Sequence, residues 1–310
     1  MTHEVVLLGW PVGHSLSPVM QEAAFASLGL DWRYSALAVR PHHLERVLAD
    51  LAASPAVIGA NVTLPHKIKV LQHVPPGRPA IAAAGAANTL VRDRGAGFVA
   101  HNTDVEGFLG CLAAAGFNPG GARCVVLGAG GAARACAVGL AAAGAAEVTV
   151  VGRSLSRARQ LVEGLKPGME GPAGACHLLA RDWSGLDAAL AGDDPGPPSS
   201  PCNDGRMLLI NATPVGMWPG VSGSPLSPFQ VETLPPGTQV VDLVYRPRMT
   251  RLLALAGDAG LPAAGGQEML VRQGAASLSL WLGEPVAERV VEAMRRALQQ
   301  ALKREEAAAC

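Results

Sequence analysis

Residues 124–133 have the sequence Cys124-Val125-Val126-Leu127-Gly128-Ala129-Gly130-Gly131-Ala132-Ala133. Four apolar residues typical of a buried strand lead into a G-x-G-x-x-A loop, and an Ala-rich stretch typical of a helix follows. Glycine at positions 128 and 130 allows a tight turn and a close approach of the backbone to a pyrophosphate, which the helix amino terminus attracts. The stretch therefore predicts a dinucleotide-binding unit with residues 128–133 against the cofactor. A merely tight strand–helix turn is the alternative.

The next predicted strand, residues 147–151, is followed by Gly152, Arg153 and Ser154, with Arg157 three residues further on. NAD sites usually place Asp or Glu here to hold the ribose 2′-hydroxyl. A carboxylate would repel a 2′-phosphate, whereas a guanidinium pairs with it through charge-assisted hydrogen bonds. The arginines and the missing acid predict NADP as the cofactor. Two solvated arginines at a helix start are the alternative.

The 310 residues suffice for two domains. Short β-branched runs alternate with Ala/Leu-rich helical stretches, which is typical of a mainly parallel sheet covered by helices. We predict an α/β fold class with a Rossmann-type dinucleotide-binding domain, an α/β substrate domain and a cleft between them. The pattern also predicts a helix after Pro65 through Val70. Residues 192–206, almost all turn formers, are predicted to be a surface insertion without chemistry.

Composition narrows the classes of function. Basic and acidic residues number 25 each, so the formal net charge is zero. This balance argues against a nucleic-acid or membrane surface as the main partner and favours a small-molecule ligand. The six cysteines show no metal-type spacing and no C-x-x-C pair, which favours free thiols in a reducing compartment. The cysteine spacing gives no reason to expect a bound metal. The amino terminus shows no signal-peptide pattern, so we expect a cytoplasmic protein.

Four polar clusters lie where predicted strands or turns end. They occupy residues 13–18, 61–67, 85–89 and 101–104. Hydroxyls and amides at strand ends are the expected lining of a site for a small polyhydroxylated ligand. Each cluster also has a purely structural explanation, because Ser17-Pro18 could start a helix and residues 102–104 could cap one.

The residue patterns of these clusters, and their order along the chain, resemble the motifs of the shikimate dehydrogenase family. The resemblance continues toward the carboxyl end and covers about residues 5 to 284. Residues 211–217 (NATPVGM) resemble the family's N-A-T-P-x-G-M segment. Residues 242–250 resemble its D-x-x-Y-x-P-x-x-T segment, and residues 265–273 resemble its G-x-x-M-L-x-x-Q segment.

The resemblance implies reduction of 3-dehydroshikimate to shikimate with NADPH, in aromatic amino acid biosynthesis. It implies a substrate domain of residues 1–103 with 266–310 and a cofactor domain of residues 104–265. Lys67 and Asp104 would be the catalytic pair. The substrate would contact Ser15, Ser17, Asn61, Thr63, Lys67, Asn88, Asp104, Tyr245 and Gln273. NADP would contact Gly128, Ala129, Gly130, Gly131, Ala132, Ala133, Arg153, Ser154, Arg157, Thr213, Met217, Leu243 and Gly266.

The lysine and the aspartate also make chemical sense on their own. Hydride reduction of a ketone creates negative charge on oxygen, which a lysine can neutralise and protonate while a carboxylate orients it. Gly152 departs from the family's Asn, which removes one expected adenosine-ribose contact. Two other functions stay open: a quinate/shikimate dehydrogenase with relaxed use of NAD and NADP, and a catalytically silent NADP-binding sensor. We expect a monomer or a homodimer.

Overall fold

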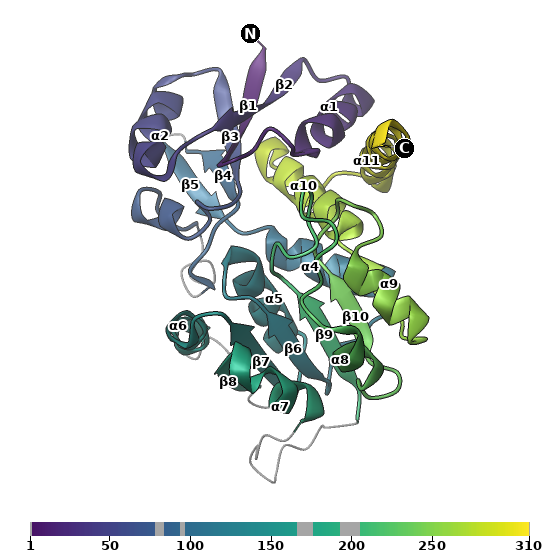
Figure 1. Ribbon diagram of the computed structural model, residues 1–310. Coiled ribbons are helices and arrows are strands. Elements are labelled where there is room, and N and C mark those ends of the chain that lie inside the picture. The colour runs from purple at the N-terminus through teal and green to yellow at the C-terminus, as the bar shows by residue number, and fades with distance from the viewer. Residues whose placement is uncertain (1, 78–83, 94–96, 166–175, 193–204, 310) are drawn as a thin grey trace. The chain divides into compact units, whose positions relative to one another are not determined.

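The computed structural model describes residues 2–77, 84–93, 97–165, 176–192 and 205–309 (Figure 1). The chain divides into two units: unit 1 comprises Met1–Gly107 and Leu270–Cys310, and unit 2 comprises Phe108–Met269. Each unit has its own sheet and its own buried apolar residues. The predicted insertion at 192–206 lies almost entirely outside the described residues. In the described parts of the chain, no helix is long and apolar enough to cross a membrane.

Unit 2 is built on a sheet of six parallel strands. They are β6 (Arg123–Leu127), β7 (Glu147–Gly152), β8 (His177–Asp182), β9 (Met207–Asn211), β10 (Gln239–Asp242) and β11 (Ala263–Gly265). Their spatial order is β8-β7-β6-β9-β10-β11, which is the 3-2-1-4-5-6 order of the Rossmann fold. The predicted Rossmann-type α/β fold is therefore confirmed. The strand order reverses between β6 and β9, so the loops after these two strands flank the switch point where ligands bind in such sheets.

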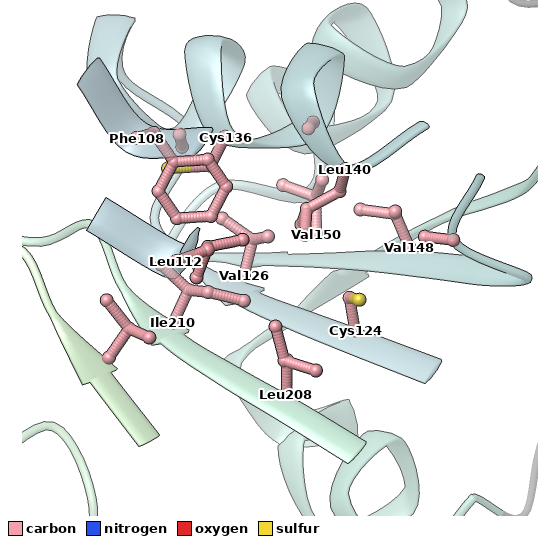
Figure 2. Close-up of a cluster of buried hydrophobic side chains, with 14 of the residues drawn as sticks. Phe108, Leu112, Cys124, Val126, Cys136, Leu140, Val148, Val150, Leu208 and Ile210 are labelled. Atoms are coloured by element: carbon pink, nitrogen blue, oxygen red, sulfur yellow. The ribbon is translucent and has the colours of Figure 1, made fainter. Parts of the chain in front are cut away.

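Helices cover both faces of this sheet because neighbouring strand residues point to opposite sides. On one face, Cys124 and Val126 of β6 pack against α4 (Asp104–Ala114), α5 (Gly131–Ala142) and α6 (Leu155–Leu165), as Figure 2 shows for α4 and α5. On the other face, Val125 and Leu127 belong to a cluster that includes residues of α7 (Leu186–Ala191), α8 (Pro228–Glu232) and α9 (Arg251–Asp258). A short 3₁₀ helix, η4, spans Trp183–Gly185.

Unit 1 holds a mixed five-stranded sheet of order β2-β1-β3-β4-β5. Its strands are β1 (His3–Gly9), β2 (Trp32–Ala38), β3 (Val57–Val62), β4 (Thr89–Arg92) and β5 (Phe98–His101). β1 runs parallel to β2 and β3, whereas β4 is antiparallel to both of its neighbours. The unit also contains α1 (Ser17–Leu28), η1 (Pro41–His43), α2 (Leu44–Ala53), η2 (Lys69–Gln72), most of α10 (Gln267–Leu282) and α11 (Glu288–Ala309).

The predicted helix after Pro65 is wrong. Residues 65–68 form turns, and the short 3₁₀ helix η2 begins only at Lys69. The Lys67 carbonyl accepts a hydrogen bond from the backbone N–H of Ala87 at 2.8 Å, a residue twenty positions away in the sequence. That bond takes the place of a helical one, and it fixes the segment that carries Lys67 against the chain that leads into β4.

Arg92, at the end of β4, secures the carboxyl end of α2. Its guanidinium donates hydrogen bonds to the carbonyls of Leu51, Ala52, Ser54 and Val57 at 2.5–3.0 Å. The last carbonyls of a helix have no partner within the helix, and a cation there also interacts favourably with the helix dipole. A single fork-shaped side chain therefore joins α2, the following turn and β3 to β4.

We predict that Arg92→Lys lowers the free energy of unfolding by about 1–3 kcal/mol, because an ammonium cannot reach four diverging carbonyls. Urea denaturation followed by circular dichroism measures this. Arg46→Lys on α2 is the control, since Arg46 and its partner Asp50 are 80% and 69% exposed in their side chains. Its expected effect is within about 0.5 kcal/mol. Equal effects of the two variants would contradict the assigned role of Arg92.

Candidate active site

Lys67 and Asp104 form a shielded ion pair in unit 1. The Lys67 Nζ lies 2.5 Å from Asp104 Oδ2, and the two side chains are only 15% and 4% exposed. Asp104 is the first residue of α4, where a negative charge is favoured by the helix dipole. An ammonium held in a fixed direction by a carboxylate can donate a proton and oppose negative charge on a bound oxygen.

Asn88 connects this pair to its surroundings. Its Nδ2 lies 2.9 Å from Asp104 Oδ1, 2.9 Å from Thr103 Oγ1 and 3.1 Å from Gln273 Oε1. Its Oδ1 accepts a hydrogen bond from the backbone N–H of Thr103 at 2.7 Å. Both oxygens of Asp104 are thus engaged, one by a cation and one by an amide, so the carboxylate has a single orientation.

Gln273 reaches this cluster from α10, which closely approaches α4. A Cβ at Gly107 would lie 2.6 Å from the Gln273 Cβ and 2.8 Å from its backbone nitrogen, so only glycine permits this approach. The Gln273 Nε2 donates to the Leu270 carbonyl at 2.8 Å, which leaves its Oε1 facing Asn88. The helix approach therefore places Gln273 beside the ion pair although it lies 185 positions after Asn88 in the sequence.

A second group of polar side chains continues from this cluster toward β2. Asn61, at the end of β3, lies 3.0 Å from Ser277 Oγ and 3.2 Å from Thr89 Oγ1 through its Nδ2. Its Oδ1 accepts a hydrogen bond from the Tyr34 hydroxyl at 2.7 Å. Burial raises the pKa of the Tyr34 hydroxyl far above its usual range, so Tyr34 remains a donor.

The polar network continues to Ser15, in the loop after β1, and to Ser17, the first residue of α1. The Ser17 side chain interacts with the Tyr34 hydroxyl, which opposes the rise in the pKa of Tyr34. The Ser15 hydroxyl donates to Ser17 Oγ at 3.2 Å and also accepts from the backbone N–H of Ser17 at 3.2 Å. One continuous network therefore links the two serines with the Lys67–Asp104 pair.

The network includes most, but not all, of the substrate residues predicted in unit 1, and it includes two residues that were not predicted. Thr63 lies outside it: its backbone N–H donates to Leu8, and among the described residues its hydroxyl has no hydrogen-bond partner. Tyr34 and Ser277 were not predicted to belong to the site. Ser277 follows Gln273 by four residues and therefore shares its helix face, which is a usable signal. No comparable sequence pattern pointed to Tyr34, because a tyrosine on the inward face of a strand is usually a core residue.

The glycine loop of unit 2 is built as predicted. Gly128 has a φ of +114°, and its N–H donates to the Val151 carbonyl at 2.7 Å. A Cβ at this position would come within 3.0 Å of the Ala212 carbonyl oxygen, so the turn needs glycine for its conformation and for the contact with the loop after β9. Gly130 caps α5, whose first N–H groups have no intrahelical partners and can bind a phosphate.

The predicted 2′-phosphate residues follow β7. Arg153 and Arg157 are exposed, and Ser154 is partly exposed at the start of α6. The Ser154 hydroxyl lies 2.8 Å from that of Ser156 and 3.5 Å from the backbone nitrogen of Arg157. Two guanidinium groups and two hydroxyls thus occur within five residues at the carboxyl end of a Rossmann strand, and this set of donors suits a phosphate.

The remaining predicted residues come from the segments after β9 and β10 and, for Gly266, from the position directly after β11. Thr213 donates its hydroxyl to Asn211 Oδ1 at 2.6 Å, and Leu243 donates its backbone N–H to the Asn211 carbonyl at 3.0 Å. The Gly266 N–H lies 3.3 Å from the carbonyl of Val244. Met217 and Tyr245 belong to the same two segments. Tyr245 is therefore the one predicted substrate residue that unit 2 supplies.

Known protein families match three parts of the chain. Residues 7–90 match the shikimate dehydrogenase substrate binding domain, residues 112–171 match shikimate / quinate 5-dehydrogenase, and residues 266–299 match the shikimate 5′-dehydrogenase C-terminal domain. A relative from Synechocystis sp., named shikimate dehydrogenase (NADP(+)), is 41% identical over 96% of this chain and 95% of its own. The chain belongs to the shikimate dehydrogenase family. The resemblance found in the motifs is thereby confirmed.

Solved structures of the family share the fold. Shikimate 5-dehydrogenase from Thermus thermophilus, in complex with NADP(H) and shikimate, is 35% identical with a TM-score of 0.76 over 96% of this chain and 100% of its own. A ligand-free 5-ketofructose reductase of Gluconobacter sp. strain CHM43 is 29% identical with a TM-score of 0.76, over 97% of this chain and 99% of its own. The fold of the shikimate dehydrogenase family thus occurs with more than one named activity.

Asp242, at the end of β10, is fully buried and has only neutral hydrogen-bond donors around it in the described residues. They are the Thr250 hydroxyl at 2.6 Å, the Asn211 amide at 2.9 Å and the Val244 N–H at 3.0 Å. Burial raises the pKa of Asp242 from 3.8 to about 6, although these donors oppose the shift. The native state therefore binds more protons than the unfolded chain at mildly acidic pH, and this group's contribution to stability falls as pH rises toward 7.

We predict that the unfolding free energy of the wild type, minus that of Asp242→Asn, falls by about 2 kcal/mol between about pH 4 and pH 7. The wild type loses stability over this range because it alone must ionise a buried group in the native state. Denaturant titrations across this range measure the difference. Asp258→Asn, at an exposed position of α9, is the control for removal of one carboxyl group, and Asp242→Asn should show the larger change with pH. A constant difference for Asp242→Asn would contradict the raised pKa.

Proposed function

We propose that this member of the shikimate dehydrogenase family interconverts 3-dehydroshikimate and shikimate with NADP(H). The observation that carries the proposal is the shielded Lys67–Asp104 pair at one end of a polar network whose other end holds two serine hydroxyls. Such an arrangement offers a proton donor and, separately, short hydroxyl donors for a carboxylate. A cyclic keto acid with hydroxyl groups needs both.

In the proposed reaction, bound NADPH would supply the hydride that the substrate carbonyl carbon accepts. Lys67 transfers a proton from its ammonium to the carbonyl oxygen, so that the ketone becomes an alcohol. Asp104 keeps the ammonium directed at that oxygen and balances its charge. In the reverse reaction, neutral Lys67 would take the hydroxyl proton back while the hydride of the alcohol carbon passes to NADP⁺.

Substrate recognition is assigned to the remaining residues of the network, to Thr63, which lies outside it, and to Tyr245. Ser15 and Ser17 would receive the carboxylate, and Thr63, Asn88 and Gln273 would face the hydroxyl groups, with Tyr245 contributed by unit 2. The Asn61 oxygen and amide are each engaged by protein groups. We therefore assign Asn61 a positioning role, through Tyr34, on the two serines.

Cofactor binding is assigned to unit 2 and substrate binding mainly to unit 1. Gly128 to Ala133 would hold the pyrophosphate, Arg153, Ser154 and Arg157 the 2′-phosphate, and Thr213, Met217, Leu243 and Gly266 the nicotinamide end. The switch point between β6 and β9 supports this assignment, since both loops border it. A cytoplasmic setting and a monomeric or homodimeric state belong to the same proposal.

A steady-state assay tests the function against its alternatives. We expect oxidation of shikimate with NADP to have the highest kcat/KM among four combinations, namely shikimate or quinate with NADP or NAD. Comparable rates with quinate and NAD would favour a quinate/shikimate dehydrogenase. Reduction of 5-ketofructose instead would align the chain with its Gluconobacter relative. NADP binding without any turnover would favour a silent sensor.

Lys67→Ala is expected to reduce turnover by about 10²–10⁴-fold, because it removes both the proton donor and the cation that opposes oxyanion charge. Asp104→Asn should also impair turnover. If the two side chains act as one unit, the double variant is little worse than the poorer single variant. Lys69→Ala, an exposed lysine on η2, is the control with unchanged turnover. Near-normal turnover in Lys67→Ala would overturn the mechanism.

Arg153→Asp is expected to raise the KM for NADP by about 10- to 150-fold while affecting NAD far less, because a charge-assisted contact with the 2′-phosphate becomes a repulsion. Kinetics with both cofactors at saturating shikimate measure the ratio. Arg159→Asp introduces the same charge change at an exposed position of α6 and serves as control. An equal rise for both cofactors would show that Arg153 acts on the helix and not on the phosphate.

A further inference from the structure

Three separate stretches of unit 2 converge on the carboxylate of Asp242. Asn211 ends β9, Val244 follows β10, and Thr250 precedes α9, yet each donates a hydrogen bond to the same group. The Thr250 hydroxyl donates its hydrogen to Asp242, and its oxygen accepts a hydrogen bond from the backbone N–H of Leu253 as the cap of α9. Neither carboxylate oxygen is without a partner, and the residue is fully buried.

The same residues order the backbone around them. The Asn211 side chain, held by Asp242 through its amide, accepts from the backbone N–H of Thr213 at 3.0 Å and from the Thr213 hydroxyl at 2.6 Å. The Thr213 oxygen in turn accepts from the backbone N–H of Val215 at 3.2 Å. The turn after β9 is therefore built on an amide whose orientation Asp242 sets.

The segment after β10 is fixed from the same point. The bond from the Val244 N–H to Asp242 closes a tight turn at Leu243, whose own N–H donates to the Asn211 carbonyl. The backbone N–H of Trp218 donates to the Arg246 carbonyl at 3.0 Å, so the two segments also hold each other further along. Residues 211–218 and 242–250 are thus joined into one hydrogen-bonded cluster with Asp242 at its centre.

We propose that Asp242 is a positioning residue for the reaction: it sets the geometry of the segments that present Thr213, Met217, Leu243 and Tyr245 to the cofactor and the substrate. This inference rests on the proposed function, because those four residues are assigned there. It adds Asp242, Asn211 and Thr250, none of which touches a reactant in the proposed mechanism.

The role requires a carboxylate. Asn at position 242 has the same shape, but one of its two terminal atoms becomes a donor and meets a group that is itself a donor. The Thr250 hydroxyl or the Asn211 amide must then turn away. Since the Asn211 amide orders the Thr213 turn, a change at Asp242 is expected to reach the cofactor segments.

The test uses Asp242→Asn, Thr250→Val and Thr250→Ser in the full chain. The dissociation constant for NADPH is measured by fluorescence titration without substrate, and kcat and KM for shikimate are measured well below each variant's melting temperature. We expect Asp242→Asn and Thr250→Val to weaken NADPH binding by about tenfold or more and to reduce kcat. Thr250→Ser keeps the hydroxyl and should recover most of the affinity.

Thr238→Val is the matched control. Thr238 lies just before β10, is as buried as Thr250, and donates its hydroxyl to the Pro235 carbonyl at 2.6 Å. Its replacement should lower the melting temperature about as much as Thr250→Val and leave NADPH binding and kcat unchanged. If Asp242→Asn and Thr250→Val likewise lower only the melting temperature, Asp242 is merely structural and the inference is overturned.

Failure of the proposed function would look different. Wild-type chain that binds NADPH but does not turn over shikimate would refute the function, while the titrations would still decide the positioning role. Wild-type chain that binds no NADPH would overturn both. Weakened binding in Asp242→Asn with recovery in Thr250→Ser supports the inference in either of the first two cases.

Discussion

The constraint on which unit 1 depends is the shielding of two opposite charges from water. A lysine and an aspartate that are mostly buried lose hydration, and their attraction offsets that loss only when the other donors and acceptors around them are also satisfied. Asn88 satisfies the second oxygen of Asp104 while Thr103 and Gln273 orient Asn88. The extent of the polar network follows from this need, since each amide brought inside requires further partners of its own.

The same constraint explains why elements distant in sequence meet. Gln273 and Ser277 come from α10, whereas Asn88 and Thr89 introduce β4, and their side chains bond across 185 and 188 positions. Gly107 permits the helix approach that this requires. Packing and chemistry are thus inseparable here: a larger residue at position 107 would displace the groups that hold the charged pair as surely as a change within the network.

Sequence alone predicted the Rossmann unit well, because its signals are local. The β6 strand, the glycines after it and the start of α5 lie within ten residues, and each restricts the backbone of the next. Asn88, Lys67 and Asp104 lie in the polar clusters that the sequence places at strand ends, and the family resemblance selected them as candidate site residues. Tyr34 and Ser277 were missed and a helix after Pro65 was wrongly expected, because both outcomes depend on long-range bonds. The Ala87–Lys67 backbone bond and the Tyr34–Asn61 bond have no local signature.

Two buried carboxylates in one chain show how the partner determines the task. Asp104 faces a cation, so its charge is neutralised locally and serves to aim an ammonium. Asp242 faces only a hydroxyl, an amide and a backbone N–H among the described groups, and burial raises its pKa to about 6. A carboxylate without a cation is unfavourable to bury, and a neutral residue would be more stable at that site if only packing mattered. Asp242 accepts hydrogen bonds from three separate stretches of the chain, through two side chains and one backbone N–H, and an apolar residue could not provide these bonds. One carboxylate therefore holds an ammonium in a fixed direction, and the other holds three separate stretches of the chain together.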